Sequence, residues 1–313
     1  MNALLFPGQG SQVVGMGLEF YNNFDIVKKI FQEANDRLKY DVTKMIFEGP
    51  EEVLKLTKNT QPAILTVSYS IFKVLEKNYG YTLKSFEYFA GHSLGEYSAL
   101  VSSESLSFSD ALYLLHERGK SMQEAVPVGE GGMIAVLGLK IHEINNLLKT
   151  HNQENEICEI ANDNAEGQVI ISGIKKSIDN LMISFKEKKI KSIPLKVSAP
   201  FHCYLMRPAA ESMKEKITST EFKDPKVKII NNVTAKAVDE SKRIKELLIK
   251  QIYSTVKWRE SILNIADDGV KNFIELGPGK ALIGMVKRTI KNANCFSINS
   301  IVDIKKLEYE LRK

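Results

Sequence analysis

A serine closely flanked by glycines follows a short, mostly apolar segment of this chain. Residues 91–95 read Gly-His-Ser-Leu-Gly, and the small residues after them are typical of a helix. This G-x-S-x-G pattern predicts a sharp turn between a strand and a helix, in which only glycines fit beside the serine. Such a turn exposes the Ser93 hydroxyl and directs the backbone N–H of Leu94 at the group that the hydroxyl attacks. Because so short a pattern also arises by chance, a purely structural turn is the alternative.

Strands and helices alternate around this turn. Residues 61–78 carry apolar side chains at helical spacing, and Ser107 begins a second helix with a capping-box pattern. The apolar runs that we expect to be strands of this unit are residues 3–6, 86–90, 227–231 and 272–275. Alternation of this kind predicts a parallel α/β sheet.

A different order of elements begins at the glycine-rich segment 129–132, a candidate hinge. The order is strand, helix, strand, strand, helix, strand, which is that of a split βαβ, ferredoxin-like unit. We therefore expect an α/β domain formed by residues 1–128 and 199–313, interrupted by a small α+β subdomain at 129–198. The expected strands of the subdomain are 133–137, 157–161, 168–172 and 190–197, its helices are 141–150 and 174–189, and its turn is 162–164.

Composition excludes several classes of protein. The chain has 313 residues and a net charge of +5, which is too small an excess for a nucleic-acid binder but suits an acidic substrate or protein partner. No apolar run approaches the roughly 18 residues that a membrane span needs, and the first residues do not resemble a signal peptide. Cys158, Cys203 and Cys295 form no spaced set, so we expect no disulfide scaffold and a reducing cytoplasm.

No bound cofactor or metal is expected. The glycines at 8–10 lack the third glycine of a dinucleotide fingerprint, and Gly279-Lys280 lacks the rest of a P-loop. No H-E-x-x-H or comparable metal-ligand motif is present in the sequence.

A nucleophilic serine needs a base, and the sequence contains five histidines. His116, His142 and His151 fall on expected helices, and His92 lies inside the turn itself. His202 lies where the inserted segment returns to the larger domain, and such junctions often hold functional sites. His202 is therefore the candidate base, and a hydrogen-bonded loop histidine is the alternative.

Six motifs follow one another along the chain: FPGQGSQ at 6–12, GHSLGEY at 91–97, Arg118-Gly119, QVIISG at 168–173, Phe201-His202 and ELGPG at 275–279. Together they resemble the malonyl-CoA:acyl-carrier-protein transacylases of type II fatty acid synthesis. The resemblance extends from Leu4 to about Arg288. It implies an α/β-hydrolase-like core with a parallel sheet and an inserted ferredoxin-like subdomain, in agreement with the organisation read from the residues.

The resemblance also implies a set of catalytic residues. Ser93 would be the nucleophile and His202 its base, so that a dyad replaces the usual triad. Gln251 would orient His202 through its main-chain carbonyl and would lie among the residues around the substrate. The backbone amides of Gln9 and Leu94 would form the oxyanion hole.

Further residues would contact the acyl group. Arg118 would bind the free carboxylate of malonyl, and Phe201 would fill the space that a methyl branch requires. His92 and Asn162 are also expected at the substrate. One departure is Glu166, at a position where proline is frequent in the family.

The implied reaction transfers malonyl from malonyl-CoA to the phosphopantetheine thiol of acyl carrier protein through a malonyl-serine. The coenzyme A thioester and phosphopantetheine are substrates, and we expect a monomer. Lys186, Lys188, Lys189 and Lys191 are candidates for docking the acidic carrier protein, although a solvated helix face is the simpler interpretation. Two other classes remain open: a serine hydrolase with the same turn, and a non-catalytic interaction module. Arg118 argues against the serine hydrolase, because a buried guanidinium does not help to bind a neutral acyl chain.

Overall fold

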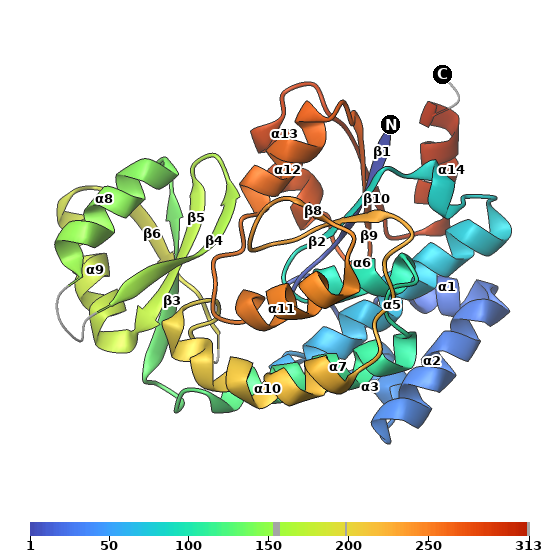
Figure 1. The fold of residues 1–313 in the computed structure, drawn as a ribbon, viewed down its shortest axis with the longest axis horizontal. Coiled ribbons are helices and arrows are strands. Elements are labelled where there is room, and N and C mark those ends of the chain that lie inside the picture. Colours follow the sequence, from blue (N-terminus) through green and yellow to red (C-terminus); the bar gives the residue numbers. More distant parts are fainter. Residues whose placement is uncertain (153–156, 198, 312–313) are drawn as a thin grey trace.

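Two sheets organise the chain, of which the computed structural model describes residues 1–152, 157–197 and 199–311. Figure 1 shows the smaller sheet and its helices on one side of the molecule and the larger sheet, with most of the helices, on the other. The fold is therefore a mixed α/β arrangement with a parallel core sheet and a separate antiparallel sheet. Among the helices of the described residues, none is long and apolar enough to cross a membrane.

The larger sheet has six strands in the order β10-β9-β1-β2-β7-β8. All neighbours pair in parallel except β8, which runs antiparallel to β7. In spatial order its strands are β10 (Asn294–Ile298), β9 (Asn272–Leu276), β1 (Asn2–Phe6), β2 (Tyr88–Gly91), β7 (Lys228–Ile230) and β8 (Ala237–Val238).

Both faces of this sheet are buried because its strands carry apolar residues at successive positions. In β1, Leu4 and Phe6 pack into the core on one face, whereas Ala3 and Leu5 pack into the core on the other. Parallel sheets are typically covered on both faces in this way. The second core contains residues of α12 (Trp258–Asp267) and α13 (Ala281–Thr289). The first contains residues of α1 (Leu18–Asn23), α2 (Asp25–Leu38), α3 (Val42–Glu48), α4 (Glu51–Leu54), α5 (Thr57–Asn78), α6 (Gly95–Ser102), α7 (Phe108–Glu124), α10 (Arg207–Ser219), α11 (Ser241–Gln251) and α14 (Ile301–Leu311).

The smaller sheet is inserted between α7 and α10. Its order is β4-β5-β3-β6, and all neighbouring strands are antiparallel. Helices α8 and α9 form a separate core with one face of this sheet, while Met133 and Ile170 from the other face join the core of the larger unit. The elements are β3 (Gly131–Leu137), α8 (Ile141–His151), β4 (Cys158–Ala165), β5 (Gln168–Ile174), α9 (Lys175–Glu187) and β6 (Lys191–Pro194).

The expected turn at 162–164 is wrong. These residues belong to β4, which continues to Ala165 with two irregularities in its pairing with β5. Asparagine and aspartate disfavour strands, but here the main unit supplies pairing partners: the N–H of Asp163 donates to the carbonyl of Val256, and the N–H of Val256 donates to that of Ala161. Two smaller differences are that β6 ends at Pro194, before the expected 197, and that residue 198, the expected end of the subdomain, lies outside the described residues.

Helix α5 begins at Thr57, four residues before the expected start. Pro62 lies inside it and has no N–H to donate, so the carbonyl of Lys58 loses its usual helical partner. The ring Nδ1 of His116 lies 3.2 Å from this carbonyl and compensates for the loss. A contact from a distant helix therefore allows α5 to extend past the proline, and no local pattern could have predicted it.

Candidate active site

The serine turn joins β2 to α6 at the carboxyl edge of the larger sheet. A methyl group on Gly91 would overlap the carbonyl of Gly95, and one on Gly95 would overlap the carbonyl of Phe6, so both positions require glycine. Ser93 between them has a φ of 53°, in the left-handed region that costs a residue with a side chain about 1 kcal/mol. Its N–H donates to Oδ1 of Asn232 at 2.7 Å, which helps to hold the turn.

Ser93 and His202 meet directly, although 109 residues separate them. The Ser93 hydroxyl lies 2.8 Å from Nε2 of His202, and Nδ1 of His202 lies 2.9 Å from the main-chain oxygen of Gln251. A carbonyl oxygen can only accept a hydrogen bond, so Nδ1 carries the proton and Nε2 is free to accept one. Burial, with a smaller contribution from Arg118, lowers the pKa of His202 to about 3. The imidazole is therefore neutral over the physiological range and can act as a base.

Arg118 extends from α7 to the same point. Its side chain is only 1% exposed, and burial lowers its pKa. Its Nη2 donates to the hydroxyl of Ser93 at 3.0 Å and to Oε1 of Gln251 at 3.0 Å, while Nη1 donates to Oε1 of Gln61 at 2.7 Å. All three partners are uncharged. Within the part of the chain that the structure describes, no carboxylate forms an ion pair with this guanidinium.

Gln9 and Leu94 lie on two loops that meet at the turn. Gly8, next to Gln9, approaches so closely that a methyl group on it would lie 2.7 Å from the carbonyl oxygen of His92. Neither the N–H of Gln9 nor that of Leu94 has a hydrogen-bond partner among the described residues. Two unpaired N–H groups beside a serine hydroxyl are what an oxyanion hole requires.

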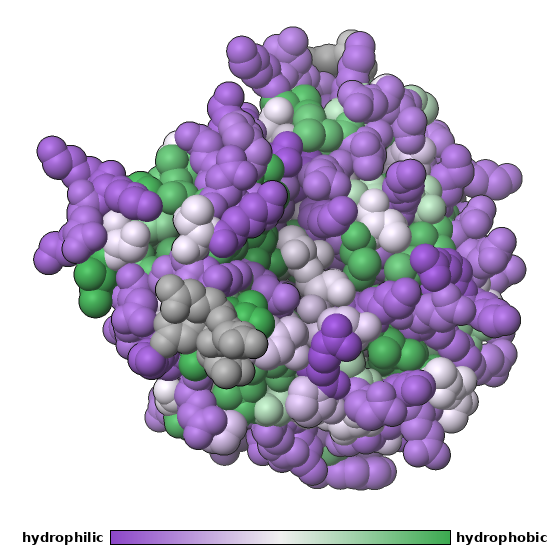
Figure 2. Space-filling model, turned by 60° about the vertical axis from the view of Figure 1, so that its left-hand side comes forward, coloured by the Kyte–Doolittle hydropathy of each residue, from purple (hydrophilic) through white to green (hydrophobic). Residues whose placement is uncertain are grey.

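A cavity of about 280 Å³ opens above Ser93 between the two units. Met133, Ile170 and Leu195 of the inserted segment form part of its wall, and α13 contributes Met285. Its polar lining includes Gln9, Ser93, His202, His92, Asn162 and Asn164. The face of the molecule seen in Figure 2 is mostly hydrophilic, with hydrophobic side chains in smaller groups between.

His92 and Asn162 therefore both reach this cavity. Nε2 of His92 lies 2.9 Å from Oδ1 of Asn164, and its ring packs against Trp258 at 5.6 Å. Phe201 behaves differently: it is 8% exposed and belongs to the core of the larger unit, and it is absent from the residues that line the cavity.

Four polar residues at the site were not singled out from the sequence. Gln61 binds Arg118, Asn164 binds His92, and Asn232 binds the turn. Glu96 is part of the motif at 91–97; it is buried, and its side chain accepts from Gln251. Only Glu96 had a signal in the sequence, because it follows the serine motif; Gln61 is an ordinary residue of an apolar helix until the fold is known.

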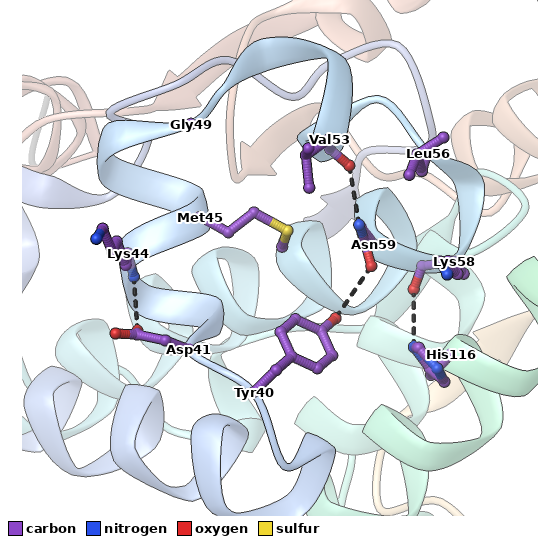
Figure 3. A pocket seen from close by; sticks show the side chains of 10 residues that line it. All are labelled: Tyr40, Asp41, Lys44, Met45, Gly49, Val53, Leu56, Lys58, Asn59 and His116. Carbon is purple, nitrogen blue, oxygen red and sulfur yellow. Dashed lines mark hydrogen bonds between the residues drawn. The ribbon is translucent and has the colours of Figure 1, made fainter.

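A second hollow, of about 520 Å³, lies away from the serine, between α3, α4, α5 and α7 (Figure 3). Several of its polar groups form hydrogen bonds with the helices around it. Asp41 accepts from the N–H of Lys44 at the start of α3, Asn59 pairs with Tyr40 and with the carbonyl of Val53, and His116 binds Lys58 as described above. We assign no reaction to this hollow.

A serine in a strand–turn–helix, a neutral histidine and a buried guanidinium define a site for transfer of an acyl group. Comparison with known proteins agrees: the acyl transferase domain family matches residues 3–308. The malonyl CoA-acyl carrier protein transacylase of Bacillus subtilis is 44% identical over 298 residues, which cover 95% of this chain and 93% of that protein. The enzyme of the same name from Haemophilus influenzae is 41% identical over 98% of this chain and 97% of its own length.

Solved structures give the same result. The acyl-carrier-protein-S-malonyltransferase from Bartonella henselae has a TM-score of 0.96 at 38% identity and covers 100% of this chain and 99% of its own. A malonyl-transacylase solved in complex with its type II PKS acyl-carrier protein has a TM-score of 0.94 at 38% identity, with 98% and 99% of the two chains covered. The chain therefore belongs to the acyl transferase family and, within it, to the malonyl CoA-acyl carrier protein transacylases.

Proposed function

We propose that this protein transfers the malonyl group from malonyl-CoA to the phosphopantetheine thiol of acyl carrier protein, in fatty acid biosynthesis. Ser93 is the nucleophile and His202 the base, and a malonyl-serine is the intermediate. The coenzyme A thioester and phosphopantetheine are both substrates, and we expect no resident cofactor.

One observation carries this proposal: a fully buried guanidinium touches the nucleophilic hydroxyl and has only uncharged partners. An unpaired buried charge is costly, and a bound anion relieves that cost. A carboxylate accepts two parallel hydrogen bonds from arginine, so an acyl group that ends in a carboxylate suits Arg118. Malonyl is such a group. A hydrolase for neutral acyl chains gains nothing from this arginine.

In the first half-reaction, Nε2 of His202 takes the proton of the Ser93 hydroxyl as the oxygen attacks the thioester carbon. The carbonyl oxygen becomes an oxyanion, which accepts from the N–H groups of Gln9 and Leu94. When the tetrahedral intermediate collapses, the carbon–sulfur bond breaks and the coenzyme A sulfur takes the proton from His202. Malonyl remains on Ser93 as an ester.

In the second half-reaction, His202 takes the proton of the phosphopantetheine thiol, and the sulfur attacks the ester carbon. The same two N–H groups stabilise the second oxyanion. Its collapse breaks the carbon–oxygen bond, and the Ser93 oxygen recovers the proton from His202. The enzyme returns to its first state, so the kinetics are ping-pong.

We also infer that the inserted unit is ferredoxin-like and that the core is α/β-hydrolase-like. Support for the first comes from the order β3-α8-β4-β5-α9-β6 and from a sheet in which the first and third strands are central. Support for the second comes from the parallel sheet that ends in the serine turn at β2. A monomer in the cytoplasm remains the expectation, as do the domain limits 1–128, 129–198 and 199–313.

The proposal is tested by incubating the protein with malonyl-CoA, acetyl-CoA and methylmalonyl-CoA separately and measuring its intact mass. We expect a malonyl adduct on the peptide that contains Ser93 and none in Ser93→Ala. Addition of phosphopantetheinylated carrier protein should then remove the adduct and acylate the carrier. Release as free malonate, with no acylated carrier, would instead identify a hydrolase.

A further inference from the structure

Glu96 is the second residue of α6, and it is buried, with 1% of its surface exposed. Among the described residues, each hydrogen-bond partner of this side chain is a donor. Nδ2 of Asn231 donates to one of its oxygens at 2.6 Å, and Nε2 of Gln251 and the N–H of Asn232 donate to the other at 2.7 and 3.1 Å. Three donors and no acceptor form a site for a carboxylate, not for a carboxylic acid.

Gln251 connects this carboxylate to the reacting groups. Its main-chain oxygen accepts from His202, and its side-chain Oε1 accepts from Arg118 at 3.0 Å. A glutamine side chain can be rotated end for end, which would turn its NH₂ group toward Arg118. Glu96 opposes that rotation because it accepts from the NH₂ group at 2.7 Å, together with the main-chain oxygen of Ser93 at 3.1 Å and Oδ1 of Asn232 at 3.3 Å. Its carboxylate forms the shortest of the three hydrogen bonds that fix which end of the amide faces the guanidinium.

We propose that Glu96 is a positioning residue for the transfer reaction, which holds Gln251 so that its two oxygens orient His202 and Arg118 toward Ser93. The inference rests on the proposed function. Glu96 touches neither substrate nor the reacting atoms. It acts through Gln251, which also binds Arg118 of α7 and His202 of the segment between β6 and α10.

Protonation of Glu96 would undo this arrangement, because the added O–H would point at one of the three donors. Burial raises the pKa of Glu96 to about 7, against the opposing effect of its donors and of Arg118. The other titratable groups around it stay in one state near that pH. Burial raises the pKa of Tyr97 to about 12 and lowers that of His202, across Ser93, to about 3, and arginine keeps its proton in proteins. His92, on the far side of His202, also has a lowered pKa.

The test follows acylation of Ser93 by malonyl-CoA alone, in rapid-mixing experiments read by intact mass between pH 5.5 and 8.5. In wild type, the rate should fall as the pH drops through 7, approaching tenfold per unit. Glu96→Gln should lower the plateau rate on the order of 100-fold, as expected for misplaced catalytic groups, and should remove the inflection near pH 7. A merely structural role would lower the amount of folded protein but leave the pH profile unchanged.

A second variant separates misfolding from lost positioning. In Glu96→Gln, the new NH₂ group must face the NH₂ group of Asn231, so two donors oppose each other. Asn231→Asp in the same chain replaces one of these donors with an acceptor and allows a hydrogen bond. The double variant Glu96→Gln/Asn231→Asp should regain at least tenfold in rate over Glu96→Gln. Glu104→Gln is the matched control, because Glu104 is half exposed and pairs with Lys226 at the surface. It should retain the wild-type rate and pH profile.

The outcomes distinguish this inference from the function on which it depends. If wild type acquires no malonyl adduct, the proposed function itself fails. If wild type is acylated but Glu96→Gln matches it in rate and in pH profile, Glu96 does not position the site. A folded double variant, with the melting temperature of wild type, that regains no activity would also overturn the inference.

Discussion

Ser93 and His202, whose side chains meet at 2.8 Å, both have left-handed backbones, with φ values of 53° and 59°. Residues with side chains rarely adopt this conformation. At Ser93 it lifts the hydroxyl out of the strand–helix turn, and at His202 it lets the chain reverse as it leaves the inserted unit. Both of the residues that must meet are therefore strained, and strain of this kind is often stored at functional sites.

This strain predicts an unusual order of stability at position 93. The free energy of unfolding of Ser93→Gly should be about 1 kcal/mol higher than that of Ser93→Ala, because glycine adopts the left-handed region without cost. Ser98, in the middle of α6, provides the matched control. There the order should be reversed, and Ser98→Ala should be about 1 kcal/mol more stable than Ser98→Gly. The same order at both positions, measured by urea denaturation, would show that the turn is unstrained in solution.

The lowered pKa of His202 predicts a dependence of stability on pH. Below pH 6.5 the unfolded chain binds a proton at this residue, while the folded protein does not until about pH 3. The free energy of unfolding should therefore fall as the pH drops from 6.5 toward 3, by up to about 1.4 kcal/mol per unit. His202→Asn removes this contribution. Its stability relative to wild type should rise steadily as the pH drops, and two parallel curves would contradict the assignment.

Local sequence patterns could predict the parts of the fold that depend on near neighbours. The glycines at 91 and 95 specify the turn because any side chain there would overlap the backbone. The helix at Ser107 begins as its capping pattern predicts, with the hydroxyl accepting from the N–H of Asp110 at 3.0 Å. Alternation of strands and helices likewise predicted a parallel sheet.

Contacts between distant segments could not be read in the same way. The strand through Asn162 exists because Val256 pairs with it from the other unit, and α5 passes Pro62 because of His116. The partners of the buried polar groups are equally distant in sequence, and Asn232 reaches Ser93 across 139 residues. The sequence could nominate the serine, the histidine, the arginine and Gln251, but not the side-chain amides of Gln61 and Asn232, which bind Arg118 and the turn.

Phe201 is predicted to limit the size of the acyl group. It directly precedes His202, and removal of its ring would leave space beside the base. Phe201→Ser should raise the use of methylmalonyl-CoA relative to malonyl-CoA by about tenfold, since one methyl group is worth about 1 to 3 kcal/mol. Because the ring is packed in the core, the variant should also lose about 3 kcal/mol of stability. Loss of stability with an unchanged ratio of kcat/KM values would make Phe201 a core residue only.

Docking of an acidic carrier protein should depend on salt. The rate of malonyl transfer to the carrier should fall as the salt concentration is raised from about 50 to about 500 mM, because salt screens the charges. The rate of transfer to free pantetheine should change far less. The exposed lysines at 186, 188, 189 and 191 lie in the last turn of α9 and in the segment that follows it, and Lys191 pairs with Leu137 at the end of β3. Charge reversal at Lys186 and Lys188 should raise KM for the carrier alone if this surface docks it. An unchanged KM would place the docking surface elsewhere.

The strongest prediction concerns Arg118. Its guanidinium lies 3.0 Å from the Ser93 hydroxyl, and no carboxylate of the described residues pairs with it, so the free carboxylate of malonyl is its expected partner. Arg118→Ala should lose about 2 to 5 kcal/mol of malonyl recognition, the usual effect of removing one member of a buried charged pair. Arg118→Lys should also be impaired, because lysine keeps the charge but loses the two parallel hydrogen bonds.

Acetyl-CoA provides the control, because its acyl group has no carboxylate. For Arg118→Ala the value of kcat/KM should fall much less with acetyl-CoA than with malonyl-CoA, and it can even rise, since removal of the arginine leaves an uncharged pocket. The comparison also accounts for the structural role of Arg118, which binds Gln61 and Gln251 in the absence of substrate. Loss of those contacts lowers both rates equally, so only the ratio of the two reports on the carboxylate. If the two substrates decline in parallel in both variants, Arg118 supports the site without reading the acyl group, and a hydrolase becomes the better description of this chain.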